Sequence, residues 1–402
     1  MLSLDQALAH YAQLKALSTQ QSLALEDAHG RVLATDLTST LDLPPMRQSA
    51  MDGYAVHASD LRHAATQPVE LPVTQSIAAG DTPRPLPAGQ CARIFTGAPL
   101  PDGADSVEIQ ENVLGDATRA VFTQTVQSGR HVRQRGEEVQ AGQVLLHAGQ
   151  RLNAARLSIA AGAGHAQVPC RAQPRVAIIV SGSELVAPGS ERGPAQIFES
   201  NGSFLAHFVR DQGARVSRLT RCPDDPAQLS ACVAAALDDC DMLLISGGAS
   251  VGDHDHSRAA CQANAVHELF WKVAQKPGKP LSFGRGPDGQ AVFVLPGNPA
   301  SVYACAMLHV RMALAHLCGV TAPAPLHAKL TQPVSGDQRR TRLLRVCVAA
   351  DASGQLTARP LPHQASHMTS NLASANALAR IEAGQDWPAG HIVSCWLNTD
   401  LG

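Results

Sequence analysis

The chain has 402 residues, of which 45% are hydrophobic and 16% charged, and its net charge is −2. This composition is typical of a globular protein with enough core for about two to four domains. The near-neutral charge and the aromatic content of 3% argue against a basic or base-stacking surface. We therefore expect no nucleic-acid partner and no membrane partner, and any anion site must be built locally.

The ten cysteines are scattered, and no Cys-x-x-Cys pair occurs. This pattern favours reduced, buried thiols and argues against a structural zinc site. Asp5, His10 and Lys15 interrupt the N-terminal segment, which is unlike the apolar part of a signal peptide. We predict a cytoplasmic protein.

The first predicted element is a helix over residues 3–17, with apolar residues at helical spacing and Ser3 as its N-cap. From residue 22 to about 169 the chain changes to short segments broken by proline and glycine, which indicates β-rich modules. Asp52 lies there in an Asp-Gly turn signal, and Thr96 follows a short strand pattern. Taken alone, both patterns are ordinary turns.

Between residues 175 and 301 three apolar runs each end in a glycine-rich turn. Runs of this kind predict strands buried on both faces of a parallel sheet, whose ligands bind at the carboxyl ends of the strands. We expect an anionic ligand where the turns meet. The turn residues that we assign to substrate binding are Ser181, Gly182, Gly247, Gly248, Ser250, Gly252, Pro296, Gly297, Asn298 and Ser301.

Three helices are predicted in this segment, over residues 202–212, 227–237 and 300–317. A proline-containing linker at 321–325 then leads to a second β-rich module. Its strand candidates are residues 343–348, 356–359 and 392–396.

Lys272, Lys276 and Lys279 cluster in one loop that Pro277 and Pro280 stiffen. Lysine is a compact cation suited to an oxyanion, so we predict an anion-binding loop rather than a merely solvated one. No Walker lysine pattern occurs, which argues against a P-loop NTPase. The Asp-His-Asp-His run that contains Asp255 is better suited to hydrated Mg²⁺ beside a substrate phosphate than to a transition metal.

Together these motifs resemble the molybdopterin molybdenumtransferase (MoeA) family, which includes the E domain of gephyrin. The resemblance covers nearly the whole chain. Its carriers are Ser49-Ala-Met-Asp-Gly-Tyr-Ala55, Ile94-Phe-Thr-Gly-Ala-Pro99, Arg135-Gly-Glu137, Ser181-Gly-Ser-Glu-Leu185, Ser246-Gly-Gly-Ala-Ser-Val-Gly252, Lys276-Pro-Gly-Lys-Pro280 and Leu295-Pro-Gly-Asn-Pro299.

The resemblance implies a multidomain protein with α/β and β-rich parts: a central parallel-sheet molybdopterin-binding domain and a C-terminal β-barrel-like domain. We place an N-terminal helix at 1–21, packing on the α/β domain, and a connecting β-rich domain at 22–43 and 142–169. An inserted β-rich domain with Asp52 and Thr96 follows at 44–141, the α/β domain at 170–324 and the C-terminal domain at 325–402.

The resemblance further implies an elongated homodimer that inserts molybdate into adenylylated molybdopterin and releases AMP. A molybdopterin adenylyltransferase would supply that substrate, and molybdoenzyme chaperones would take the product. The implied catalytic residues are Asp52, Thr96, Glu184, Asp224 and Asp255, with Glu138 at a further acidic position. Asp224 and Asp255 are the implied Mg²⁺ ligands, making Mg²⁺ the expected cofactor.

In the C-terminal module, Arg340 and Arg345 match the family's basic pair, and Ser366 or Ser370 its serine near the anion site. Three departures stand out: Ser183 replaces a frequent carboxylate, His256 a common aromatic, and Arg342-Leu343 the usual Glu-Phe.

Two alternatives stay open at this point. The chain could be a non-catalytic scaffold of the same fold, or an adenylyltransferase acting on unmodified molybdopterin.

Overall fold

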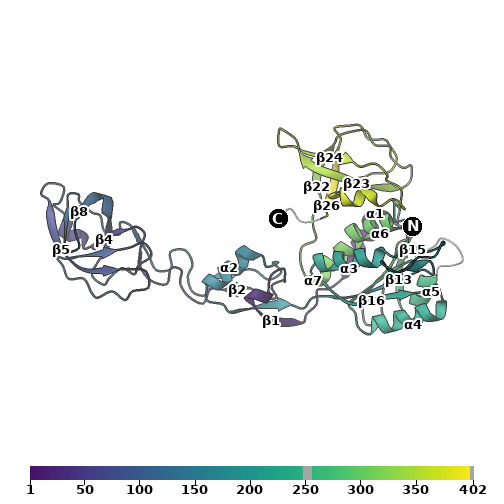
Figure 1. Ribbon diagram of the computed structural model, residues 1–402, viewed down its shortest axis with the longest axis horizontal. Coiled ribbons are helices and arrows are strands. Elements are labelled where there is room, and N and C mark those ends of the chain that lie inside the picture. Colours follow the sequence, from purple (N-terminus) through teal and green to yellow (C-terminus); the bar gives the residue numbers. More distant parts are fainter. Residues whose placement is uncertain (248–255, 399–402) are drawn as a thin grey trace.

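The computed structural model describes residues 1–247 and 256–398. The molecule is elongated (Figure 1): one β-rich domain, with β4, β5 and β8, lies at one end, and the α/β and C-terminal domains lie together at the other. A small module with β1, β2 and α2 lies between them. The long axis therefore separates the inserted domain from the predicted anion site.

The α/β domain is built on a sheet in the order β16-β13-β17-β21-β20-β18. The three predicted strands are β13 (Arg175–Ser181), β17 (Met242–Ser246) and β21 (Ala291–Leu295), and they lie side by side in parallel. β16 (Arg215–Cys222) adds to them in parallel, whereas β20 (Ser282–Arg285) runs antiparallel to both β21 and β18 (His267–Trp271). The predicted parallel core is confirmed, within a mixed sheet.

Helices cover both faces of this sheet because successive β13 residues point to opposite sides. Val176 and Ile178 pack with α3 (Asn201–Asp211), and Ala177 and Ile179 pack with α4 (Pro226–Leu237) and α5 (His256–Ala263). The third predicted helix is continuous from Pro299 to Cys318, as α6 (Pro299–Cys305), a π-helical stretch (Ala306–Val310) and α7 (Arg311–Cys318). It is apolar and long enough to cross a membrane, but 89% of its most apolar window is buried, as in a core helix.

The N-terminal helix is shorter than predicted. α1 spans Leu4–Ala9 and continues as a 3₁₀ turn, His10–Gln13, before Leu14 becomes extended. Ser3 and Gln6 form a capping box, as the N-cap prediction required. Leu4 and Tyr11 are buried in the core of the α/β domain.

The β-rich region between residues 20 and 171 contains two modules. The inserted one is a curled sheet in the order β7-β4-β6-β5-β9-β8, with a β3–β10 ribbon beside it. Its strands are β3 (Gln48–Ser49), β4 (Gly53–Val56), β5 (Val69–Ile77), β6 (Cys91–Ile94), β7 (Ser106–Ile109), β8 (Val113–Gly115), β9 (Arg119–Phe122) and β10 (Val132–Arg133). Short 3₁₀ turns lie at Ala58–Leu61 and Gln110–Asn112.

The connecting module pairs β1 (Gln20–Ala24) with β12 (Gln167–Arg171) and β2 (Leu37–Thr38) with β11 (Val144–Leu146), and a 3₁₀ turn spans Leu25–Asp27. The helix α2 (Ala154–Gly162), which the sequence patterns did not predict, packs here. Its signal was Asn153, whose side chain accepts a hydrogen bond from the Arg156 N–H at 3.0 Å, as an N-cap does.

The C-terminal domain is a closed barrel, because β23 pairs with β25 as well as with β24. Its strands are β22 (Leu326–Leu330), β23 (Thr341–Ala350), β24 (Leu356–Pro360), β25 (Ala377–Ile381) and β26 (Ile392–Leu397), with a 3₁₀ turn at Ser370–Ala373. β19 (Gln275–Lys276), from the lysine-rich loop, adds to β23 in parallel. The barrel is thereby joined directly to that loop. A small parallel pair, β14 (Leu185–Val186) and β15 (Ile197–Phe198), follows β13.

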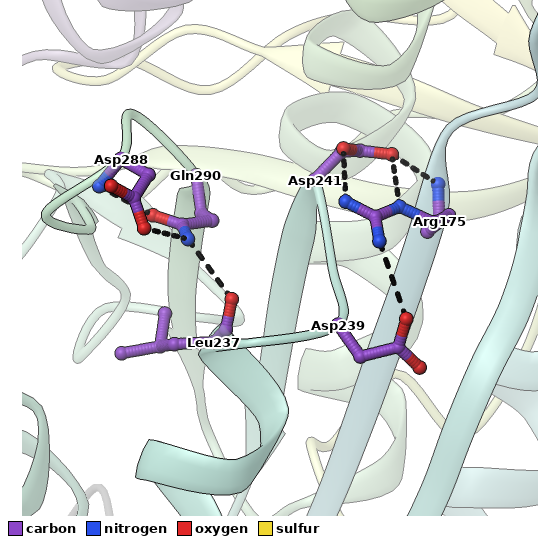
Figure 2. A network of polar contacts seen from close by, with 6 residues as sticks. All are labelled: Arg175, Leu237, Asp239, Asp241, Asp288 and Gln290. Atoms are coloured by element: carbon purple, nitrogen blue, oxygen red, sulfur yellow. Dashed lines mark hydrogen bonds and ion pairs between the residues drawn. The ribbon is translucent and has the colours of Figure 1, made fainter.

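An ion-pair network closes the amino-terminal edge of the α/β sheet (Figure 2). Asp241, just before β17, accepts from the Arg175 backbone N–H at 2.7 Å and from its guanidinium at 3.1 and 3.3 Å. Asp239 accepts a further guanidinium hydrogen bond at 3.2 Å. This network lies at the amino ends of β13 and β17, where it holds the two strands in register. It is therefore at the opposite edge of the sheet from the predicted ligand site.

Candidate functional site

The three glycine-rich turns meet at the carboxyl ends of β13, β17 and β21. Asn201, which opens α3, donates hydrogen bonds to the Gly297 carbonyl at 2.7 Å and to Ser246 Oγ at 3.0 Å. Gly247 adopts φ +98°, and a Cβ there would lie 2.0 Å from the Ser181 carbonyl oxygen. Only glycine allows such close approach of two turns. The predicted convergence is present in the structure.

Asp224 and Ser181 form the polar part of this edge. Ser181 Oγ donates to Asp224 Oδ1 at 2.6 Å, and the Asp224 backbone N–H donates to Ser183 Oγ at 3.2 Å. Glu184 is exposed on the same turn, and its Oε2 lies 2.8 Å from where a Cβ of Gly182 would be. Ser183, which replaces a carboxylate of the family pattern, thus holds the loop that carries Asp224. We call Ser181, Gly182, Glu184, Asp224 and Gly247 the strand-end cluster.

Four predicted site residues, Gly248, Ser250, Gly252 and Asp255, lie outside the described residues. Their assignments stay predictions. Within residues 1–247 and 256–398, no group of three or more His, Cys, Asp or Glu side chains could hold a metal ion. Mg²⁺ commonly uses one or two carboxylates together with waters and substrate phosphates, so the exposed carboxylate of Asp224 is compatible with a Mg²⁺ role.

A second group of predicted residues lines a cavity of about 320 Å³ between the α/β domain and the barrel. Its walls are the β19 loop, the turn after β21, the start of β23 and the segment before the Ser370–Ala373 turn. We call it the lysine cavity. The predicted residues that line it are Lys276, Lys279, Pro296, Gly297, Asn298, Ser301, Arg340 and Ser366.

Cations dominate the charge of the lysine cavity. Lys276, Lys279, Arg340 and Arg342 line it, and the carboxylate of Asp337 pairs with two of them. Asp337 accepts from Arg340 at 2.8 Å and lies 3.9 Å from Lys276 Nζ. The Arg340 hydrogen bond, followed by a backbone bond from Arg339, lowers the pKa of Asp337 to about 2. Among the described residues, four cations thus line the cavity and Asp337 pairs with two of them, so the cavity suits an oxyanion.

Hydroxyl and amide groups complete the cavity wall. Asn298 Nδ2 donates to Ser366 Oγ at 3.3 Å, which links the turn after β21 to the barrel. Ser301 lies on the first turn of α6 and is buried. The Pro296–Asn298 turn also approaches Gly247: a Cβ built on Gly297 would lie 3.7 Å from the Gly247 Cα. The cavity and the strand-end cluster therefore share this turn as a common wall.

Some predicted residues do not line the lysine cavity. Lys272 instead stacks on Trp271, with its Nζ 3.5 Å from the ring centroid. Ser370 is exposed at the start of a 3₁₀ turn, so Ser366 is the serine that reaches the cavity. Arg345 is buried and donates to the carbonyls of His363, Ala365 and Met368. It shapes the segment that carries Ser366.

Three further polar side chains of the cavity wall were not assigned from the sequence: Gln275, Gln364 and Arg342. In the sequence, Arg342 stands out only as a departure from the family pattern. It lies opposite Lys276 in the β19–β23 pairing, a register that the sequence could not reveal because the paired segments are 66 residues apart.

Asp52 and Thr96 do lie together, but in the inserted domain. Asp52 directly precedes β4, and its Oδ1 accepts from the Thr96 N–H at 2.8 Å and the Thr96 hydroxyl at 2.7 Å. In Figure 1, β4 lies at the end of the molecule opposite the α/β domain. Within one chain, the Asp52–Thr96 pair is therefore far from the lysine cavity.

Comparison with known proteins matches three family models along the chain. The MoeA N-terminal region (domain I and II) matches residues 2–164, a "Probable molybdopterin binding domain" 177–316, and the MoeA C-terminal region (domain IV) 327–397. Molybdopterin molybdenumtransferase 2 of Mycobacterium tuberculosis is 38% identical over 376 residues, covering 90% of each chain. The chain belongs to the molybdopterin molybdenumtransferase family.

Other members of the family agree with this assignment. The molybdopterin molybdenumtransferase of Nostoc is 35% identical over 380 residues, covering 92% of this chain and 87% of its own. The crystal structure of the molybdopterin biosynthesis MoeA protein from Pyrococcus horikoshii OT3 superposes with a TM-score of 0.85 at 27% identity, over 99% of this chain and 100% of that one. The multidomain molybdenumtransferase fold with its C-terminal barrel is thus confirmed, and the family acts in molybdenum cofactor biosynthesis.

Proposed function

We propose that this chain inserts molybdate into adenylylated molybdopterin and releases AMP, giving molybdenum–molybdopterin. The observation that carries the proposal is the lysine cavity: four cations and the hydroxyls of Ser301 and Ser366 around about 320 Å³. Molybdate is a compact dianion, and a cavity that holds it in a slightly acidic protein must concentrate cationic donors. The names of the family's members support the same reaction.

The strand-end cluster supplies the neighbouring site for the pterin nucleotide. Turn backbones that end parallel strands bind phosphates of nucleotide ligands, and the Pro296–Asn298 turn connects this site to the lysine cavity. In this arrangement the pterin dithiolene would face the molybdate. Mg²⁺ near Asp224, with Asp255, would neutralise charge at the phosphate during AMP release.

Exchange of molybdate oxygen for dithiolene sulfur releases oxygen as water, so groups that accept and donate protons must lie close by. We assign this role to Asp52 and Glu184. Asp52 lies too far along the molecule to act on its own chain's cavity. We therefore propose a homodimer in which the Asp52–Thr96 pair of one chain completes the lysine cavity of the other.

We further propose that the enzyme works in the cytoplasm, which agrees with all ten cysteines being free thiols. An adenylyltransferase would hand over the adenylylated pterin, and molybdoenzyme chaperones would take the product.

The test is release of AMP from adenylylated molybdopterin by the purified chain, followed as molybdate is titrated in the presence of Mg²⁺. We expect release that saturates with molybdate and a product that reconstitutes an apo-molybdoenzyme. A chain that binds the pterin but releases no AMP would be a scaffold. Consumption of ATP with unmodified molybdopterin would identify an adenylyltransferase instead.

A further inference from the structure

A chain of side-chain hydrogen bonds runs through the core beneath the lysine cavity. The Tyr11 hydroxyl lies 2.8 Å from His309 Nδ1, and His309 Nε2 lies 2.8 Å from Gln275 Oε1. Gln275 Nε2 then donates to the Gly278 carbonyl at 3.4 Å and approaches Cys305 Sγ at 3.5 Å. These residues come from the N-terminal segment, the long core helix and the lysine loop itself.

The direction of each hydrogen bond in this chain is determined. The Gly278 carbonyl can only accept, so the Gln275 NH₂ group faces it and the Gln275 Oε1 faces His309. His309 Nε2 therefore carries the hydrogen, and Nδ1 accepts from the Tyr11 hydroxyl. Full burial lowers the pKa of His309 to about 3, so its ring is neutral at physiological pH.

The chain of hydrogen bonds ends on the backbone that carries the cavity lysines. Gly278 adopts φ +94°, and a Cβ there would lie 2.6 Å from Gln275 Nε2 and 2.7 Å from Cys305 Sγ. The loop therefore closes directly onto the Gln275 amide. Gln275 is fully buried and Lys276 is exposed, as successive residues of a strand are. Fixing the Gln275 side chain inward fixes Lys276 toward the cavity.

We propose that Gln275 and His309 are positioning residues of the lysine cavity: through the Gly278 carbonyl they hold the loop that presents Lys276 and Lys279 to an oxyanion. Neither side chain needs to touch the anion. His309 acts as a neutral donor that keeps the Gln275 amide in the one orientation that closes the loop. The identity of the oxyanion rests on the proposed function, whereas the positioning does not.

The test compares two substitutions at one position. His309→Leu removes the donor to Gln275 Oε1, while His309→Gln provides an amide N–H that can replace it. Molybdate is titrated into each full-length variant by calorimetry. We expect His309→Leu to weaken binding by about tenfold, and His309→Gln to stay within about threefold of the unsubstituted chain.

Val310→Ala is the matched control, because Val310 is fully buried beside His309 and belongs to no hydrogen-bond chain. It should lower the melting temperature without changing molybdate affinity. Equal affinity of His309→Leu and the unsubstituted chain would overturn the proposal, as would equal weakening by Val310→Ala. If His309→Leu does not fold, Gln275→Met takes its place, because it removes the amide that donates to the Gly278 carbonyl. Unchanged affinity in that variant would likewise overturn the proposal.

Hydrogen exchange provides a readout that needs no ligand. The amides of Lys276, Gly278, Lys279 and Leu281 should exchange faster in His309→Leu or Gln275→Met than in Val310→Ala, and equal rates would refute positioning. If the unsubstituted chain itself fails to bind molybdate, the proposed function fails, while the exchange comparison still decides the role of His309.

Discussion

Thr96 holds Asp52 by two hydrogen bonds to the same carboxylate oxygen, at 2.8 Å from its backbone N–H and at 2.7 Å from its hydroxyl. The backbone bond, then the hydroxyl bond, lowers the pKa of Asp52, and Arg93 adds to the effect. Asp52 is therefore ionised at neutral pH and able to accept a proton. A second pair in the same domain has this geometry: Asp116 accepts from the Thr118 N–H and hydroxyl at 2.7 Å each.

Asp52→Asn should give a folded protein with severely reduced insertion activity, because it removes a charge and a proton acceptor while keeping the size of the side chain. The measurement is molybdate-dependent AMP release from adenylylated molybdopterin. Asp116→Asn is the matched control, since it makes the same chemical change in an Asp–Thr turn of the same domain and should leave activity intact. Near-normal activity of Asp52→Asn would remove Asp52 from the mechanism.

Lys276→Ala and Lys279→Ala should each weaken molybdate binding by about 1–3 kcal/mol, because each removes one charged donor from the lysine cavity. Titration calorimetry measures the loss. Arg62→Ala serves as the control, because Arg62 is an exposed cation of the inserted domain whose side chain donates to the Ser59 carbonyl. If all three variants bind molybdate like the unsubstituted chain, the loop is only a solvated turn.

Arg342→Gln should weaken molybdate binding and reduce its dependence on salt, because one of four cavity cations is lost. Arg339→Gln, a neighbouring arginine outside the cavity wall, should change neither quantity. Affinity measured across a series of salt concentrations tests this. Identical salt dependence in both variants would show that Arg342 faces solvent rather than the anion.

The free energy of unfolding should decrease as the pH falls below about 6.5, because His309 is buried as a neutral ring. Its pKa in the folded chain is lowered from 6.5 to about 3 by burial, so only the unfolded chain takes up a proton between these values. Its contribution to stability is complete above pH 6.5. It then falls by about 1.4 kcal/mol per pH unit toward pH 3. Urea unfolding at several pH values in this window measures the slope, and His309→Gln should reduce it. An unchanged slope would mean that His309 is protonated in the folded chain.

Local sequence patterns were sufficient for the parallel core of the α/β domain. Apolar runs define β13, β17 and β21 because every residue of these strands except Arg175 is buried, and the turns after them must then converge. The first predicted helix was too long, because the backbone becomes extended at Leu14. Tertiary packing outweighs the helical spacing of apolar residues there. The helix α2 was not predicted, because glycine residues on both sides of it indicate turns.

The lysine cavity could be predicted only in part. Lysine clustering and the glycine turns identified six of its 17 lining residues, since those residues carry their chemistry in short motifs, and the family resemblance added Arg340 and Ser366. Arg342 and Gln275 could not be found this way, because β19 joins β23 across domains and His309 meets Gln275 through the core. Lys272 belongs to the same sequence cluster, yet it stacks on Trp271 outside the cavity wall.

Because β4 lies at the opposite end of one chain from the α/β domain, a complete site requires residues of two chains (Figure 1). The direct measurement is the activity of purified, differently tagged heterodimers of Asp52→Asn and Lys276→Ala chains. One of the two sites in each heterodimer would be free of both substitutions, so we expect about half of the unsubstituted activity from two inactive parents. Heterodimers as inactive as both parents would contradict the claim and place the whole site within one chain.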